Sequence, residues 1–288
     1  MTRRNTLMAG LSALAAACTP SLGTFDTLTP KDGGARRMVR DAVCGPDPRN
    51  RVDVYAPNGT AAGANLPVIV FIYGGSWASG DKNDYQFLGQ ALASRGFLVA
   101  MPNYRLVPET LFPGFIEDCA LGVKWVSENI AAHGGDPSRI VLMGHSAGAY
   151  NAIMLALDRR YFRAADPGAI RGFAGLAGPY NFLPLDVAST RNAFGQAPDL
   201  NATQPINFAR ADGPPLLLLW GDRDTTVGRK NIIGMERAAH AAGENIETKV
   251  YPRVDHVGIM LALSLPFRGS APVLDDVTAF ARRVTAQG

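Results

Sequence analysis

The amino-acid sequence predicts an α/β protein with a mostly parallel sheet that helices cover on both faces. Continuous apolar runs, such as residues 66–73 (LPVIVFIY), are typical of strands buried on both faces. Amphipathic segments of helical period lie between these runs, and clusters of proline and glycine such as Gly213-Pro214-Pro215 separate the two kinds of segment. Strands that alternate with helices in this way indicate a parallel sheet.

The expected strands and helices follow one another from Arg51 onward. The strands are expected around Val52 and Val54 and at 66–73, 96–102, 139–144, 172–178, 215–221 and 246–252. The helices are expected at about 84–94, 115–131, 147–158, 229–242 and 272–285. No internal repeat interrupts this alternation, so we predict one domain over residues 35–288.

The composition excludes several classes of protein. A charged share of 18% argues against a disordered chain, and a net charge of +3 without basic runs argues against nucleic-acid binding. Three cysteines without a CxxC pair exclude a disulfide scaffold and give no sign of a zinc site. Cys44 and Cys119 could pair in an oxidising compartment, but the position of Cys119 on the apolar face of an expected helix favours a buried thiol.

The first residues are typical of an export signal. Arg3 and Arg4 precede an uncharged stretch, Leu7 to Ala17, that is too short to span a bilayer but suits a signal peptide over residues 1–17. Small residues precede Cys18, so this cysteine could be the lipid-modified residue of a lipoprotein, and the start also loosely resembles a twin-arginine signal. We expect an exported protein, periplasmic or membrane-anchored through Cys18; the alternative is an uncleaved, frayed N-terminus. Residues 18–34 are rich in Thr, Gly and Pro and are expected to form a tether.

The motif Gly144-His145-Ser146-Ala147-Gly148 fits the pattern G-x-S-x-G. It follows an expected buried strand and begins an expected helix, and this order is the one that a nucleophile elbow requires. Small flanking residues fit a tight turn, which lifts the serine hydroxyl above the sheet. We therefore predict that Ser146 is a nucleophile; the alternative is a glycine-rich turn without chemistry.

A serine hydroxyl needs a general base, and the chain has only four histidines. His133 precedes a turn, His145 is the variable residue of the elbow, and His240 lies in an alanine-rich helix. Only His256 lies in a loop just beyond a late strand, so we predict that it is the base. The alternative is a loop histidine that bonds to the backbone.

A third group must accept the imidazole N–H of the base. The segment Gly221 to Val227 (GDRDTTV) follows the strand before the His256 strand and offers Asp222 and Asp224. Either choice gives the chain order Ser, Asp, His, which is that of α/β-hydrolases.

With these residues the chain resembles α/β-hydrolase-fold carboxylesterases, near the branch shared by hormone-sensitive-lipase-like esterases, feruloyl and acetyl-xylan esterases and kynurenine formamidases. The resemblance extends from about Arg51 to the end. The motifs that carry it, in the family's order, are Tyr73-Gly74-Gly75-Ser76-Trp77, Asn103-Tyr104-Arg105-Leu106-Val107-Pro108-Glu109, Gly134-Gly135-Asp136-Pro137, the elbow, the 221–227 segment and the His256 loop. It implies the α/β-hydrolase fold, with a mostly parallel sheet of about eight strands and a small cap or none.

The resemblance also implies roles for single residues. The family's G-x-x-D-x-x-V pattern aligns its acid with Asp224, which leaves Asp222 to cap the loop. By the same carry-over, the N–H groups of Gly75 and Ser76, with that of Ala147 after the nucleophile, form an oxyanion hole.

At three further positions the residue differs from the family's pattern or leaves its role open. Tyr73 stands where the family usually has a histidine, and Asn103 where it commonly has an aspartate; both positions concern loop support. Trp77 is expected either to line the substrate pocket or to pack in the core.

The sequence lacks the patterns of other chemistries. Gly75 to Lys82 has one residue too many for a phosphate-binding loop, and neither G-x-G-x-x-G nor H-E-x-x-H is present. We therefore predict no cofactor, no metal and no nucleic-acid partner.

The predicted function is that of a serine carboxylic-ester hydrolase. It would act through an acyl-enzyme on short-chain or small aromatic esters, because the segment from Gly178 to Ala211 is long enough for a modest cap but not for a large lid. The alternatives are a formamidase or other small amidase and a non-catalytic binding protein on the same fold. The sequence does not identify the natural substrate or the oligomeric state.

Overall fold

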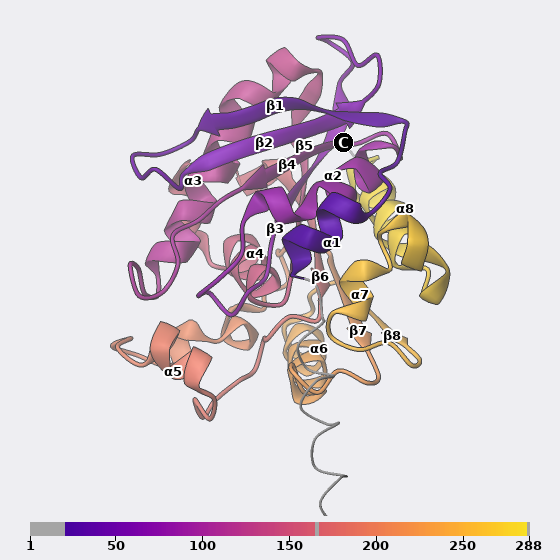
Figure 1. Cartoon of the computed structure of the whole chain (residues 1–288). Coiled ribbons are helices and arrows are strands. Elements are labelled where there is room, and N and C mark those ends of the chain that lie inside the picture. The colour runs from indigo at the N-terminus through magenta and orange to yellow at the C-terminus, as the bar shows by residue number, and fades with distance from the viewer. Residues whose placement is uncertain (1–20, 165–166, 287–288) are drawn as a thin grey trace, which may run out of the picture.

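The computed structural model describes residues 21–164 and 167–286. Eight strands form one sheet in the order β1-β2-β4-β3-β5-β6-β7-β8 (Figure 1). They are β1 (Ala35–Val43), β2 (Arg51–Pro57), β3 (Leu66–Ile72), β4 (Leu98–Pro102), β5 (Gly135–His145), β6 (Ile170–Leu176), β7 (Leu216–Gly221) and β8 (Ile246–Tyr251). Strand β2 pairs antiparallel with β1 and β4, and the strands from β4 to β8 are parallel. The predicted mostly parallel sheet is confirmed.

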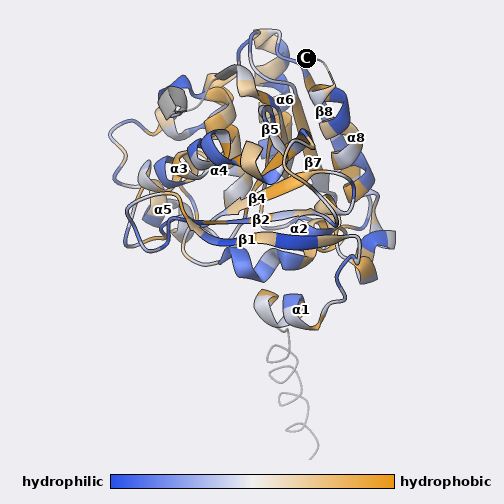
Figure 2. Cartoon of the chain, turned by 90° about the horizontal axis from the view of Figure 1, so that it is seen from above, coloured by the Kyte–Doolittle hydropathy of each residue, from blue (hydrophilic) through white to orange (hydrophobic). Residues whose placement is uncertain are grey.

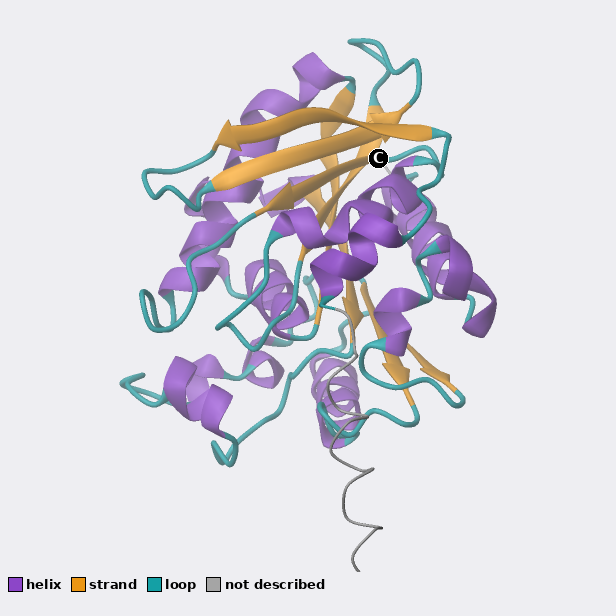
Figure 3. Ribbon diagram, in the orientation of Figure 1, coloured by secondary structure: helices purple, strands orange, loops and turns teal. Residues whose placement is uncertain are grey.

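Helices cover both faces of the sheet (Figures 1 and 3). They are α1 (Leu22–Leu28), α2 (Gln86–Ala93), α3 (Gly114–Asn129), α4 (Ala147–Leu157), α5 (Ala188–Phe194), α6 (Lys230–Ala242), α7 (Gly258–Leu261) and α8 (Val273–Thr285). Helices α2 and α8 contact one face, and α3, α4 and α6 lie over the other. The five helices expected from periodicity all form, with ends within a few residues of the prediction.

The hydrophobic effect accounts for this layering. The central strands and helix α4 are buried along almost their whole length, and Figure 2 shows the hydrophobic colour of central strands such as β7. The outer helix α8 instead buries one stripe, including Val277 and Phe280. Its first turn carries Asp275 and Asp276, and its last turn Arg282 and Arg283, which suits the helix dipole.

The register brings the carboxyl ends of the central strands level with one another. Ile72 of β3 lies opposite Gly144 of β5, which in turn lies opposite Gly175 of β6. The loops that leave β3 and β5 therefore emerge side by side. In parallel sheets this edge is where ligands bind.

The expectation of a tether over residues 18–34 is wrong for residues 22–28, which form α1. Asp26 is buried, and its carboxylate accepts a hydrogen bond of 2.8 Å from the N–H of Phe87 at the start of α2. This long-range contact explains why the local composition did not reveal the helix. The expected signal peptide and Cys18 lie outside the described residues.

Strand β1 is a second element that the sequence prediction lacks. Its segment ARRMVRDAV has no apolar run, and most of its residues are partly or fully exposed. It is an edge strand, so only the pairing with β2 defines it.

Candidate active site

Ser146 occupies a strained turn between β5 and α4. Its φ of 54° and ψ of −124° lie outside the regions that L-residues favour, and its N–H donates to the carbonyl of Leu176 at 2.9 Å. The flanking glycines are required by close approach: a Cβ on Gly144 would lie 2.3 Å from the Gly148 carbonyl oxygen, and one on Gly148 2.1 Å from that of Ile72. The turn has the geometry expected of a nucleophile elbow.

A continuous chain of hydrogen bonds joins Ser146, His256 and Asp224. The Nε2 atom of His256 lies 2.9 Å from the Ser146 Oγ, and Nδ1 lies 2.8 Å from the Asp224 Oδ2. Because a carboxylate only accepts, Nδ1 of a neutral His256 carries the proton and Nε2 is free to accept from the serine. The three residues come from loops after β5, β7 and β8, so the fold alone brings them together.

The two candidate aspartates differ in their surroundings. Asp224 is buried, and its second carboxylate oxygen, Oδ1, accepts hydrogen bonds of 2.8 Å from the N–H groups of Thr226 and Val227. Asp222 is exposed and accepts from the N–H of Arg253 at 2.6 Å. Asp224 is thus the aspartate that contacts His256, and Asp222 fastens the neighbouring loop.

His145 also contacts His256, which the sequence analysis did not anticipate. Its Nε2 donates to the backbone carbonyl of His256 at 2.9 Å, and the two rings lie 4.9 Å apart. Burial, and the nearby His256 ring, lower the pKa of His145 to about 3, so the ring is neutral at neutral pH. No sequence signal marks this contact, because 111 residues separate the partners.

The loop after β3 lies beside Ser146 and carries backbone N–H groups that no protein acceptor uses in the described part of the chain. Gly75 has a φ of 125° and Ser76 a φ of 55°, and both line the same cavity as Ser146. Within the described part of the chain, the N–H groups of Gly75, Ser76 and Ala147 donate to no protein acceptor. They are available to an oxygen atom bound beside Ser146.

Tyr73 and Arg49 stabilise this loop through hydrogen bonds and ring stacking. The Arg49 guanidinium donates to the Tyr73 hydroxyl at 3.0 Å and to the carbonyls of Gly80 and Tyr104 at 2.9 Å each. The Tyr73 ring stacks on that of Tyr104 at 4.7 Å. Arg49 lies before the first recognisable motif, so no sequence signal marks it as a site residue.

Asn103 fastens the next part of the same loop. Its Oδ1 accepts from the N–H of Lys82 at 2.8 Å, and its Nδ2 donates to Asp81 at 2.9 Å. The amide therefore supports the loop, as its position in the motif implied.

The prediction that Trp77 binds substrate is wrong, and its core alternative holds. The side chain is 3% exposed, packs edge-on against Phe194 at 4.8 Å, and donates its indole N–H to Asn151 at 3.1 Å. It does not line the cavity at Ser146. Its apolar area and its polar atom are both satisfied inside the protein.

The cavity at Ser146 has a volume of about 600 Å³. Beside the polar groups, its wall is apolar. The apolar residues are Leu22 and Phe25 of α1, Val257 just before α7, Met260 and Leu261 of α7, and Phe267 of the 3-10 helix Leu265–Ser270. The segment 178–211 contributes nothing to this wall; it holds α5, and its Phe194 packs around Trp77. Helix α1, and not the segment predicted to form a cap, therefore contributes to the cavity wall.

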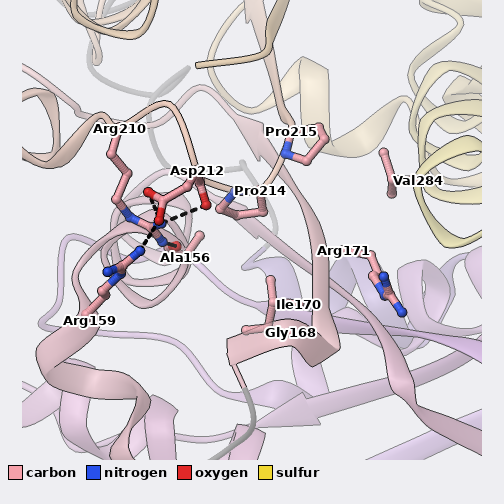
Figure 4. Close-up of a pocket in the computed structure, with 11 residues that line it drawn as sticks. Ala156, Arg159, Gly168, Ile170, Arg171, Arg210, Asp212, Pro214, Pro215 and Val284 are labelled. Carbon is pink, nitrogen blue, oxygen red and sulfur yellow. Dashed lines mark hydrogen bonds and ion pairs between the residues drawn. The ribbon is translucent and has the colours of Figure 1, made fainter. Parts of the chain in front are cut away.

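A second cavity, of about 550 Å³, lies at the opposite, amino ends of β6 and β7 (Figure 4). Arg159, Arg210 and Asp212 line it, and Asp212 pairs with both arginines. Arg210 also donates to the last carbonyls of α4, those of Ala156 and Leu157, at 3.3 and 3.2 Å. These polar groups pair with one another and with the end of α4, so they stabilise the fold.

The remaining sequence features concern the two described cysteines, metal binding and the membrane. Cys44 and Cys119 are both free, and burial raises the pKa of the Cys44 thiol to about 11. Among the described residues no group of three or more His, Cys, Asp or Glu side chains could hold a metal ion, and none of the described helices is long and apolar enough to cross a membrane.

Comparison with known proteins links this geometry to esterases. A family model described as BD-FAE matches residues 52–236. The isoprenylcysteine alpha-carbonyl methylesterase ICME of Arabidopsis thaliana is 29% identical over 269 residues, 85% of this chain and 62% of that protein. Esterase LipQ of Mycobacterium tuberculosis is 29% identical over 226 residues, 72% of this chain and 53% of LipQ. The chain thus spans less than two thirds of the length of these relatives.

Among solved structures, esterase B of Lactobacillus rhamnosis superposes with a TM-score of 0.81 at 20% identity, over 96% of this chain and 94% of that one. With the strand order, this likeness confirms the α/β-hydrolase fold that the sequence motifs implied.

Proposed function

Since the chain belongs to the BD-FAE family, we propose that the protein is a serine carboxylic-ester hydrolase that acts on short-chain or small aromatic esters. The observation that carries the proposal is the chain of hydrogen bonds from Ser146 through His256 to Asp224. That chain opens on a cavity that Gly75 and Ser76 also line, and the N–H groups of these two residues donate to no acceptor in the described part of the chain. The names of the relatives, esterases and methylesterases, support the same reaction.

The geometry supports a two-step mechanism through an acyl-enzyme. The Ser146 Oγ attacks the ester carbonyl carbon while Nε2 of His256 takes the hydroxyl proton. Asp224 accepts the Nδ1–H and stabilises the imidazolium. The C–O bond to the alcohol then breaks, and His256 gives its proton to the departing oxygen. A water molecule, deprotonated by His256, releases the acid and restores Ser146.

The backbone donors stabilise the charge that develops on the carbonyl oxygen. Among the described residues, the N–H groups of Gly75, Ser76 and Ala147 have no protein acceptor; Gly75 and Ser76 line the cavity, and Ala147 directly follows Ser146. Each such donor is worth about 2.7–4 kcal/mol in the transition state. Because these donors come from fixed loops, no reorganisation is needed during the reaction.

The size of the cavity supports small substrates. About 600 Å³ holds a ligand of ordinary size, and the aromatic rings of Phe25, Tyr85 and Phe267 in its wall suit a small aromatic or aliphatic group. An amide substrate is the second candidate on the same groups, because nothing in the hydrogen-bond chain distinguishes the two bonds.

The test is a parallel assay of purified full-length protein. We expect labelling of Ser146 by a fluorophosphonate and hydrolysis of acetyl, butyryl and methyl esters at higher kcat/KM than long-chain triglycerides. An N-formyl anilide measured beside them separates esterase from amidase. Faster turnover of the anilide would establish the amidase alternative, and an unlabelled, inactive wild-type protein would establish a binding protein.

We also propose that the chain is exported and anchored by a lipid on Cys18. The support is in the sequence: Arg3, Arg4, the uncharged stretch Leu7 to Ala17 and the small residues before Cys18. Incorporation of labelled palmitate in a bacterial host, absent from Cys18→Ala, tests the anchor. Labelled palmitate found equally in Cys18→Ala, or in neither protein, would contradict it.

A further inference from the structure

The mouth of the catalytic cavity carries apolar side chains that are open to solvent. Val257 is 49% exposed and Phe267 46% exposed, although both line the cavity. Together with Leu22, Phe25 and Leu261 they form what we call the apolar rim. Apolar surface that gathers around a cavity mouth marks an interaction site more often than isolated exposed residues do.

The exposed apolar surface extends beyond the cavity on two of the same elements. Leu28, at the end of α1, is 76% exposed, and Leu265, two residues before Phe267, is 42% exposed. Neither of them lines the cavity. They offer apolar contacts that the reaction itself does not use.

Helix α1 is fixed at this mouth. The Phe25 ring lies 5.4 Å from that of Phe87 and 6.0 Å from that of Phe267, and the buried Asp26 carboxylate holds the N–H of Phe87. Figure 1 shows α1 beside α2 and close to α7. The start of α1 therefore has a defined position next to the catalytic cavity.

The proposed anchor joins the protein at this position. Cys18 is four residues before Leu22, and four residues span at most about 14 Å even when fully extended. The uncharged stretch Leu7 to Ala17 ends at Cys18. Whether a lipid on Cys18 or the stretch itself enters a bilayer, Leu22, the first residue of the apolar rim, lies within that distance of the entry point.

We propose that the apolar rim is a membrane-docking surface and that the catalytic cavity opens directly onto the lipid surface. The occupant is a phospholipid bilayer, because the rim offers hydrocarbon and the chain beside it carries a hydrocarbon anchor. Arg268, in the same 3-10 helix as Phe267, is paired with Asp32, so the contact is apolar rather than electrostatic. This inference rests on the proposed function in one respect: the ester that enters belongs to a lipophilic molecule held in the bilayer.

Insertion of the rim is tested on full-length protein with Leu265→Cys, labelled by a dye whose emission depends on polarity. The control is Val43→Cys, because Val43 is 63% exposed on the edge strand β1 and does not line the cavity. With phosphatidylethanolamine and phosphatidylglycerol vesicles, we expect a blue shift and quenching by brominated lipids for the dye at 265 only. The shift should survive high salt, since an apolar contact is not screened. Equal responses at the two positions would overturn the proposal.

Activity gives an independent test with the double variant Leu28→Ser/Leu265→Ser. The rates compared are those on hexadecyl butyrate embedded in the vesicles and on p-nitrophenyl acetate in water. We expect the ratio of the first rate to the second to fall about tenfold, while Val43→Ser leaves it unchanged. An unchanged ratio in the double variant would contradict the proposal.

Two further outcomes separate the inference from competing explanations. A wild-type protein that shows the vesicle response but hydrolyses no ester would contradict the proposed function and still support the docking surface. If the double variant instead turns a dimer into a monomer without changing the vesicle response, the rim binds a second copy and not a membrane.

Discussion

Two cavities of this protein are similar in volume, about 600 and 550 Å³, and opposite in character. At the carboxyl ends of the strands, the backbone N–H groups of Gly75, Ser76 and Ala147 have no acceptor in the described part of the chain and remain available to a ligand. At the amino ends, Arg159 and Arg210 are both paired with Asp212, and Arg210 also holds the end of α4 (Figure 4). The difference teaches that the volume of a cavity does not assign it a function. Polar groups that the fold itself leaves without a partner do.

The largest expected effect separates the two cavities directly. Ser146→Ala should lower kcat by about 10⁶, because the three hydrogen-bonded residues act as a unit. Arg159→Ala, at the second cavity, should leave kcat/KM within about twofold, since its ion pair is exposed. Steady-state kinetics on p-nitrophenyl acetate measures both. A large loss of kcat/KM in Arg159→Ala would contradict the view that the second cavity takes no part in the reaction.

The second prediction concerns the two aspartates beside β7. Asp224→Asn should lower kcat by about 10⁴, because an amide that donates to Nδ1 forces the wrong tautomer on His256. Asp222→Asn keeps an oxygen for the N–H of Arg253 and should keep most activity. If the losses are reversed, the aspartate that supports His256 is Asp222.

A smaller effect is expected at His145. His145→Leu removes the donor that holds the His256 carbonyl, a bond worth about 0.5–1.5 kcal/mol, so kcat should fall about two- to twelvefold. KM should change little, and His145→Gln should recover part of the rate. Because the His145 pKa is lowered to about 3, the acid limb of the pH profile should not move. An unchanged kcat in His145→Leu would show that this bond does not position His256.

The smallest effect on activity, and a clear one on stability, is expected at Glu244 beneath the second cavity. Its Oε2 accepts from the N–H of Arg210 at 3.2 Å, while burial raises the pKa of its carboxyl to about 7 from a usual 4.5. The folded state therefore holds this proton up to a higher pH than the unfolded state does. Stability from this group is complete below pH 4.5 and is lost as the pH rises through 7.

Glu244→Gln should remove this part of the pH dependence. Urea unfolding at pH 5 and pH 8 measures it, and the variant should gain on the wild type at pH 8 by at most about 3 kcal/mol. Activity per folded molecule should be equal. A parallel loss of stability for both proteins between the two pH values would place the cause elsewhere.

The sequence was sufficient for the elements whose signal is local. Seven of the eight strands and five helices could be predicted, because buried strands are continuously apolar and outer helices are amphipathic. The residues around Ser146, His256 and Asp224 could be selected because a nucleophile elbow and its partners occupy fixed places in the chain order of this fold.

The tertiary structure alone decided the features that depend on distant partners. A seven-residue helix such as α1 is not stable by itself, so its threonine- and glycine-rich sequence resembles a linker until Asp26 reaches Phe87. Trp77 packs in the core and His145 contacts His256 for the same reason: each contact joins residues far apart in the chain. The sequence by itself determined the fold and the candidate reacting groups, because local pattern and chain order encode them. Only the tertiary structure decided what surrounds those groups, because the cavity wall is built from contacts that no local pattern records.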